Sequence, residues 1–132
     1  MVELFGWRDD MAAIVAQANI VCLPSYGEGL PKALLEAAAC GRAIVATDVP
    51  GCREAVHHED NGLLVPARDA RALADALERL ILDPSLRRRM GERGRARATS
   101  EFSADVVAEA TLRVYAELLA SSSGRAGAPP LL

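Results

Sequence analysis

The chain has 132 residues, a length that supports one domain with one modest hydrophobic core. Its formal net charge of -3 argues against general nucleic-acid binding, and no run approaches the roughly 20 apolar residues of a membrane span. The N-terminus does not combine a basic region with an apolar core, so we expect a cytoplasmic protein without a nucleic-acid partner.

Hydrophobic residues make up 51% of the chain but aromatic residues only 4%, so Ala, Leu and Val must fill the core, as suits an α/β domain. The three cysteines, Cys22, Cys40 and Cys52, are odd in number and lack the spacing of metal ligands. We therefore interpret them as small neutral residues in a reducing compartment, and the sequence predicts no metal site.

Short apolar runs alternate with helical patterns in the first half of the chain. The continuous apolar run Ile20–Leu23 is typical of a parallel strand covered on both faces. Strands are expected at residues 2–5, 20–23, 43–47 and 63–65, and helices at 9–18, 32–40 and 52–57. Alternation at these lengths predicts βαβ units and a Rossmann-like parallel sheet with flanking helices.

The second half of the chain is helical. Asp69 is expected to cap a helix that runs to Leu82, another helix follows at 85–98, and Ser103 would cap a last one to about Ala120. Apolar residues at helical spacing are expected to face inward, at Leu73, Ala74, Leu77, Leu80 and Ile81 in the first helix and at Val107, Ala110, Val114 and Leu118 in the last.

We interpret residues 1–120 as the domain. Residues 121–132 consist mainly of Ser, Gly, Ala and Pro and are expected to form a disordered tail.

The helix expected at 85–98 is rich in arginine. Its basic residues are Arg87, Arg88, Arg89, Arg93, Arg95 and Arg97. A solvated helix face balanced by nearby acids is the favoured interpretation. The alternative is a patch against an anionic membrane surface, which would place the protein peripherally at the inner membrane face.

Residues 24–41 carry most of the chemical information in the sequence. They indicate a turn followed by a helix, with Pro31 suited to the first helical turn and Gly41 to the C-terminal cap. A glycine-rich loop that leads into a helix N-terminus presents free N–H groups to phosphate. Glu28 in the loop and Glu36 in the helix could then bind parts of a ligand on either side of that phosphate. The alternative is a capped amphipathic helix with a solvated glutamate.

Glu28 and Glu36 are separated by seven residues, and an Ala-rich helix, an apolar run and Gly51 follow in order. This arrangement resembles the donor-binding half of retaining glycosyltransferases with the GT-B fold. The likeness extends from about residue 2 to 119, and the sequence of residues 24–32 is most similar to members that build capsular or lipopolysaccharide sugars. It implies an incomplete GT-B C-terminal domain.

The resemblance implies roles for the two glutamates. Glu36 would accept hydrogen bonds from the ribose hydroxyls of a UDP- or GDP-linked sugar, because one carboxylate matches a vicinal diol. Glu28 would hold hydroxyls of the transferred hexose and stabilise the positive charge that develops at the anomeric carbon.

The resemblance also implies further contacts with the donor. The diphosphate would face the backbone N–H groups of Gly29, Leu30, Lys32 and Ala33. Many relatives have glycine where this chain has Pro31, so one possible donor of a hydrogen bond is absent there. Trp7, Arg8 and Asp9 would touch the edge of the base, and no divalent metal would be needed.

Parts of the family pattern have no counterpart in the sequence. The family's donor domain begins with two further strands, which carry an Arg and a Lys that neutralise the diphosphate, and an acceptor-binding domain precedes it. We therefore expect this chain to be inactive alone and to self-associate through an incomplete sheet. The alternative is a non-catalytic module for interaction or weak nucleotide binding.

Overall fold

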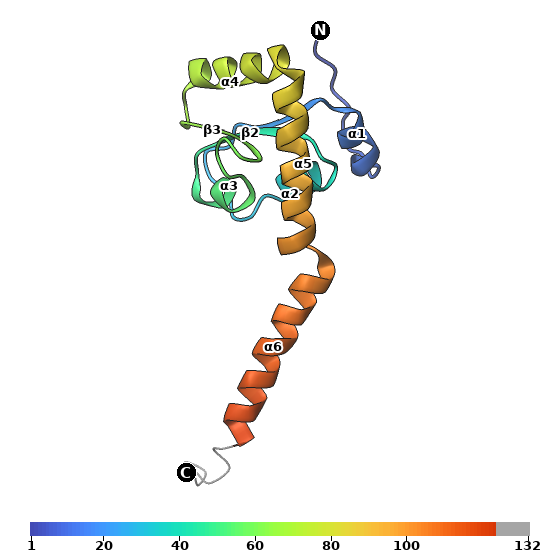
Figure 1. The fold of residues 1–132 in the computed structure, drawn as a ribbon, viewed down its shortest axis with the longest axis vertical. Coiled ribbons are helices and arrows are strands. Elements are labelled where there is room, and N and C mark those ends of the chain that lie inside the picture. Colours follow the sequence, from blue (N-terminus) through green and yellow to red (C-terminus); the bar gives the residue numbers. More distant parts are fainter. Residues whose placement is uncertain (124–132) are drawn as a thin grey trace. The chain divides into compact units, whose positions relative to one another are not determined.

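The computed structural model describes residues 1–123. It separates into two compact units that meet at Thr99 and Ser100. The first unit contains a three-stranded parallel sheet of β1 (Ile20–Leu23), β2 (Ala43–Thr47) and β3 (Gly62–Val65), in the order β1-β2-β3 (Figure 1). The predicted α/β architecture with a parallel sheet is confirmed.

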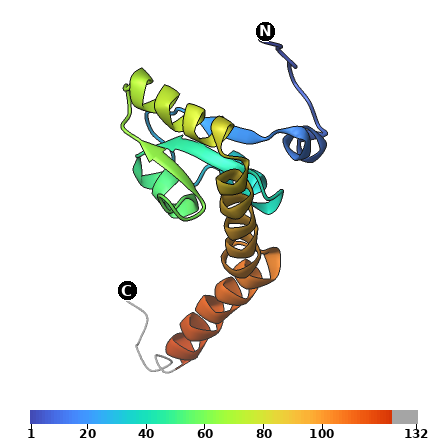
Figure 2. The same ribbon diagram turned by 45° about the horizontal axis from the view of Figure 1, so that its top comes forward.

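Helices cover both faces of this sheet. Those of the first unit are α1 (Met11–Gln17), α2 (Lys32–Ala39), α3 (Pro50–Ala55), α4 (Ala70–Leu82) and α5 (Pro84–Glu101), whose last residues belong to the second unit. Figures 1 and 2 show α4 on one side of the sheet and α2 and α3 on the other. The three strands were predicted within one residue of their observed bounds.

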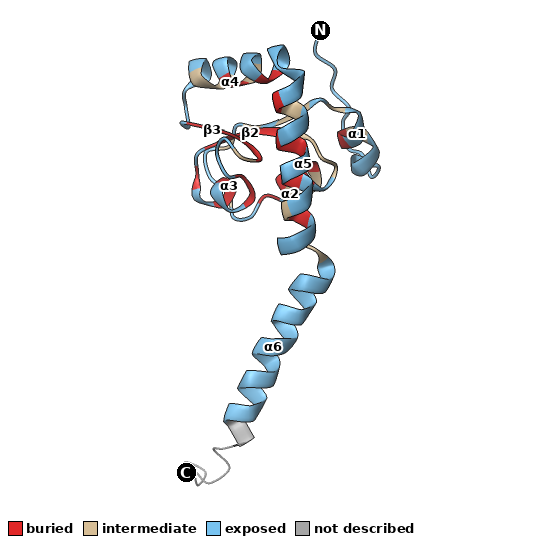
Figure 3. Cartoon of the chain, viewed as in Figure 1, coloured by how far each residue is buried: buried red, intermediate tan, exposed pale blue. Residues whose placement is uncertain are grey.

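The core lies on either side of β2. Alternate residues of a strand point to opposite faces, so Ile44 and Ala46 pack with Leu34 in one cluster, whereas Val45 packs with Leu80 in the other. Figure 3 shows the buried residues concentrated on β2 and on the helix faces that turn toward it. All five residues of β2 are buried, as expected for the central strand of the sheet.

β1 is less covered than its sequence predicted. Within the described residues it pairs only with β2, and Cys22 is exposed, so the expectation of a strand covered on both faces is wrong. An apolar run shows that burial is favourable but not whether a second neighbour is present. The expected self-association through this open edge stays a prediction.

Residues 2–5 do not form the expected strand. They lie outside any regular element, and Leu4 is 92% exposed (Figure 2). A strand needs a neighbour for its N–H and C=O groups, and no described strand pairs with this segment. α1 does begin after Asp10, but the Asp10 carboxylate binds the Arg8 guanidinium instead of capping the helix.

Helix ends agree more closely with the sequence. The Asp69 carboxylate accepts a hydrogen bond from the Ala72 N–H at 2.9 Å, which confirms the predicted cap of α4. Gly41 has a positive φ of 66°, and the Arg42 N–H closes α2 on the Ala37 carbonyl at 2.9 Å. The inward face predicted for α4 was partly wrong, because Ala74 and Ile81 are exposed, Ile81 by 60%, whereas Ala76 is buried.

The second unit contains α6 (Ala104–Ser123), and the Ser103 hydroxyl accepts from the Val106 N–H at 3.4 Å. The apolar residues expected to face inward are exposed, because periodicity defines a helix face but not what covers it. Residues 121–123 continue the helix, and the rest of the expected tail lies outside the described residues. No helix within residues 1–123 has the length and apolar character needed to cross a membrane.

Two glycines of α5 offer a test of this packing. A Cβ added at Gly91 would lie 2.1 Å from the Gly41 carbonyl oxygen, whereas one added at Gly94 would meet Ala38 at an ordinary 3.6 Å. We expect Gly91→Ala to lower the free energy of unfolding by about 1 to 3 kcal/mol, as overpacking does. Gly94→Ala should leave it unchanged or raise it by up to about 1 kcal/mol through helix propensity. Urea denaturation checks both variants, and equal midpoints would contradict the close contact.

Candidate functional site

The loop of residues 24–31 connects β1 to α2 at the carboxyl end of the sheet. Ligands of parallel α/β sheets bind at this end. A pocket of about 410 Å³ lies elsewhere, at the amino end of β2, but one of about 390 Å³ lies here, beside the ends of all three strands. It is lined by Pro24, Tyr26, Thr47, Val65, Pro66, Arg68, Asp69, Ala70 and Leu73. The loop that carries Glu28 therefore adjoins a cavity at the expected place.

Two successive hydrogen bonds, each donated by a hydroxyl group, connect Glu28 to the sheet. The Ser25 hydroxyl donates to Glu28 Oε1 at 2.5 Å, and the Thr47 hydroxyl donates to the Ser25 carbonyl oxygen. Thr47 is the last residue of β2 and only 3% exposed, so the buried strand fixes the position of Ser25. One carboxylate oxygen of Glu28 is engaged in this way, and the half-buried side chain leaves the other oxygen to a ligand.

Gly51 packs directly against the same loop. A Cβ added there would lie 1.7 Å from the Gly29 carbonyl oxygen and 2.4 Å from that of Glu28. No side chain larger than hydrogen fits, because real Cβ atoms do not approach backbone atoms so closely. The connection after β2 therefore supports the backbone on which Glu28 is mounted.

The loop glycines themselves are not required by packing. A Cβ added at Gly27 or Gly29 would meet nothing within 4 Å, and neither residue has a positive φ. The space in front of the loop backbone is therefore open to a ligand, a use for which glycine is suited.

Free backbone donors line this open side. Among the described residues, the N–H groups of Gly29, Leu30, Lys32 and Ala33 donate no hydrogen bond, whereas Leu34 and Leu35 already bind the Pro31 carbonyl. Pro31 is buried and is the N-cap of α2. It therefore lies just before the helix and not in its first turn, where the sequence predicts it. The site thus presents N–H groups and the positive end of the α2 dipole together.

Glu36 lies one turn inside α2. Its carboxylate is 3.4 Å from the Lys32 ammonium, and the side chain is 36% exposed. An exposed pair of this kind contributes only about 0 to 1 kcal/mol. A ligand hydroxyl can therefore replace Lys32 at little cost.

Cys52 lies behind the Glu28 loop, fully buried in the core cluster of α2 and α3. Burial raises the pKa of its thiol, and the nearby Glu28 charge raises it further. The thiol therefore stays protonated and acts as a small core residue.

The structure does not bring the expected base-binding residues to this site. Trp7 and Asp9 are exposed in the N-terminal segment, and the Arg8 guanidinium binds the Asp10 carboxylate at 2.7 and 2.6 Å, which lowers the pKa of Asp10. Across residues 1–123 no hydrogen bond or ion pair joins these side chains to the Glu28 loop. Their role remains a prediction.

Sequence reasoning missed several residues of the site. Ser25 and Thr47 look like ordinary polar residues at strand ends, and Tyr26 has the Arg68 guanidinium 5.4 Å above its ring centre. The rule that places ligands beyond the carboxyl ends of strands could have pointed to Thr47 and Tyr26. Residues 1–123 hold no group of three or more potential metal ligands, and metal independence stays a prediction.

The fold and the site define a class: an α/β domain with an anion-binding loop and a carboxylate at the carboxyl end of a parallel sheet. Residues 1–83 match the family described as "Glycosyl transferases group 1". The chain belongs to this family, whose relatives here are GT-B glycosyltransferases.

A curated relative is the N,N'-diacetylbacillosaminyl-diphospho-undecaprenol alpha-1,3-N-acetylgalactosaminyltransferase of Campylobacter jejuni. It is 33% identical over 114 residues, which cover 86% of this chain and 30% of the relative. The chain thus spans less than a third of that protein's length.

Solved structures show the same relationship. Sucrose-phosphate synthase from Thermosynechococcus elongatus superposes with a TM-score of 0.81 at 37% identity, over 84% of this chain and 28% of the synthase. Anabaena HepE in complex with UDP superposes with a TM-score of 0.77 at 28% identity, over 89% of this chain and 31% of HepE. The C-terminal domain of a glycosyl transferase group 1 protein from Francisella tularensis superposes with a TM-score of 0.69 at 26% identity. The match covers 78% of this chain and 53% of that domain.

The contact between Gly51 and the loop leads to a test. Gly51→Ala should displace residues 28–29, speed amide exchange of the loop and lower stability by about 1 to 3 kcal/mol. Gly29→Ala is the control, because its Cβ enters open space and should change neither stability nor exchange at Ser25. Hydrogen exchange with denaturant titration measures both, and an unchanged loop in the Gly51 variant would contradict the support assigned to it.

Proposed function

We propose that this chain is the donor-binding part of a retaining glycosyltransferase, which moves a hexosyl unit from a UDP- or GDP-linked sugar to a glycan or lipid-linked acceptor. The observation that carries the proposal is a row of four N–H groups beside Glu28 that donate no hydrogen bond within residues 1–123, together with the open space beside Gly27 and Gly29. A diphosphate is the anion that such a helix N-terminus accommodates. The UDP complexes of HepE support the same donor class.

In the proposed reaction the bond between the anomeric carbon and the diphosphate oxygen breaks, and its electron pair goes to that oxygen. The N–H groups of Gly29, Leu30, Lys32 and Ala33 stabilise the charge gained by the leaving group. The Glu28 carboxylate stabilises the opposite charge on the sugar, and its bond from Ser25 keeps it oriented without neutralising it. The acceptor oxygen then forms the new bond on the face that the diphosphate leaves, and the proton of the acceptor hydroxyl passes to the departing diphosphate oxygen.

Glu36 is proposed to bind the ribose. Its only ion pair among the described residues is the exposed one with Lys32, so two ribose hydroxyls can donate to the carboxylate. Trp7, Arg8 and Asp9 are proposed to approach the base, which requires the N-terminal segment to move from its exposed position. We further propose that these 132 residues alone bind the donor but do not transfer it, since the matched segment covers only 30% of the Campylobacter relative.

The first test is nucleotide binding. Isothermal titration of the chain with UDP and with GDP should show saturable binding of one of them. Glu36→Ala should weaken it about 10-fold or more, because hydrogen bonds to a carboxylate contribute about 1.5 to 3 kcal/mol. Glu78→Ala on exposed α4 is the charge-matched control and should bind like the parent chain. Absence of binding at millimolar nucleotide would contradict the proposal and favour a non-catalytic interaction module.

The second test separates chemistry from binding. In a chimera that carries this chain in place of the matching segment of an active relative, Glu28→Gln should lower transfer by about 100-fold or more, a typical loss for one electrostatic group. UDP affinity should stay within a factor of about 2, because Glu28 is assigned to the sugar and not to the nucleotide. Full activity of the Gln variant would rule out the role proposed for Glu28.

A further inference from the structure

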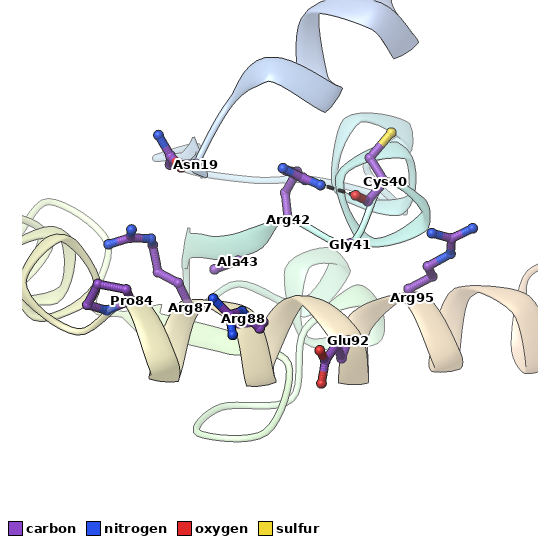
Figure 4. A pocket seen from close by; sticks show the side chains of 10 residues that line it. All are labelled: Asn19, Cys40, Gly41, Arg42, Ala43, Pro84, Arg87, Arg88, Glu92 and Arg95. Atoms are coloured by element: carbon purple, nitrogen blue, oxygen red, sulfur yellow. Dashed lines mark hydrogen bonds between the residues drawn. The ribbon is translucent and has the colours of Figure 1, made fainter.

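A second cavity lies at the opposite end of β2 from the Glu28 loop. It has a volume of about 410 Å³ and reaches Ala43, the first residue of the strand. Four arginines line it, Arg42 after α2 and Arg87, Arg88 and Arg95 on α5, and Glu92 is its single acidic residue (Figure 4). All of these residues belong to the first unit of the chain. We call this cavity the arginine pocket.

Two of the arginines are oriented by backbone carbonyl groups. Arg42 donates from Nε to the Cys40 carbonyl at 2.8 Å and from Nη1 to the Ala18 carbonyl at 3.2 Å. Arg87 donates from Nη1 to the Leu80 and Ile81 carbonyls at 2.6 and 2.9 Å. Carbonyl groups fix a guanidinium group but do not neutralise it, so both positive charges persist. Arg42 Nη2 and Arg87 Nε and Nη2 donate no hydrogen bond in the part of the chain described.

The other two arginines have no partner for their side chains in the described structure. Arg88 and Arg95 are seven residues apart on α5, so they project from nearly the same side of the helix. Glu92 is four residues from Arg88, yet it forms no ion pair among residues 1–123. Figure 4 shows its carboxylate on the side of α5 away from Arg42, while Arg87 and Arg95 extend toward the side of Arg42.

Other arginines of the first unit form ion pairs with carboxylates. Arg53, Arg79 and Arg93 each bind a carboxylate, on Asp48, Glu59 and Asp60. The chain carries 18 acidic and 15 basic residues, yet in the arginine pocket four positive charges face a single unpaired acid. Like charges in one concave site repel each other and raise the local concentration of anions.

We propose that the arginine pocket binds a small, freely soluble phosphate compound, such as inorganic diphosphate or a phosphomonoester. Guanidinium groups match phosphate oxygens with paired N–H donors, and here several point into one cavity. The concave shape and the volume fit one small anion. A membrane surface is a poorer match, because Arg42 is half-buried and two backbone carbonyl groups hold its guanidinium in place. The site is separate from the donor site proposed above.

The test is a titration of the chain with inorganic diphosphate at low ionic strength. We expect saturable binding that weakens as salt is added. The double variant Arg88→Ala with Arg95→Ala should lose about 10-fold or more in affinity, a difference that titration resolves easily. These side chains are exposed and form no described contact, so the variant should fold normally, which circular dichroism checks.

Matched controls distinguish the pocket from diffuse charge and from the donor site. Arg71→Ala with Arg89→Ala removes the same charge from exposed positions outside the pocket and should bind diphosphate within a factor of about 2 of the parent. Diphosphate binding should also persist in the presence of saturating UDP, which occupies the donor site proposed above, because the arginine pocket lies at the other end of β2. Equal losses in both double variants, or no saturation by about 10 mM diphosphate, would overturn the proposal. Binding to phosphatidylglycerol vesicles without binding of diphosphate would overturn it too, in favour of a membrane contact.

Discussion

The complete burial of β2 is the constraint on which the other features of the first unit depend. Four of its five residues contribute to the core clusters, so the same short strand carries α2 and α3 on one face and α4 on the other, and α5 contributes to both clusters. It also pairs with both remaining strands. Loss of apolar volume here would loosen both layers at once. The two cavities lie at its two ends, which the strand therefore holds at a fixed separation.

At the carboxyl end of β2 the strand positions a loop that belongs to its neighbour. Thr47 binds the Ser25 carbonyl, and Gly51 contacts the backbone of residues 28–29. One contact is a hydrogen bond and the other is steric, and both tie the connection after β1 to the connection after β2. Substitutions in the second connection can thus change the orientation of Glu28 without touching a ligand.

Sequence patterns predicted local features better than features that need a partner. The Asp69 cap and the Gly41 helix end follow from short-range chemistry, and both are confirmed. Three of residues 2–5 are apolar, yet the segment forms no strand, because pairing depends on a neighbour that no local pattern encodes. Gly51 appeared only as a turn glycine, since its contact with residues 28–29 exists only after folding. The open space at Gly29 was equally invisible in the sequence, although its chemical use was predicted.

Charge illustrates the same limit and connects the two sites. Pairs four residues apart on a helix are worth only a few tenths of a kcal/mol, and the order with the basic residue first is the weaker one. Arg88 and Glu92 have this order and do not pair, while Lys32 and Glu36 have it and pair only at 3.4 Å with the lysine largely exposed. From sequence spacing alone, both Arg88 and Glu36 would be expected to have their charges neutralised by a helix neighbour. In the folded chain, weak helix pairing leaves a carboxylate available at one end of the sheet and guanidinium groups available at the other.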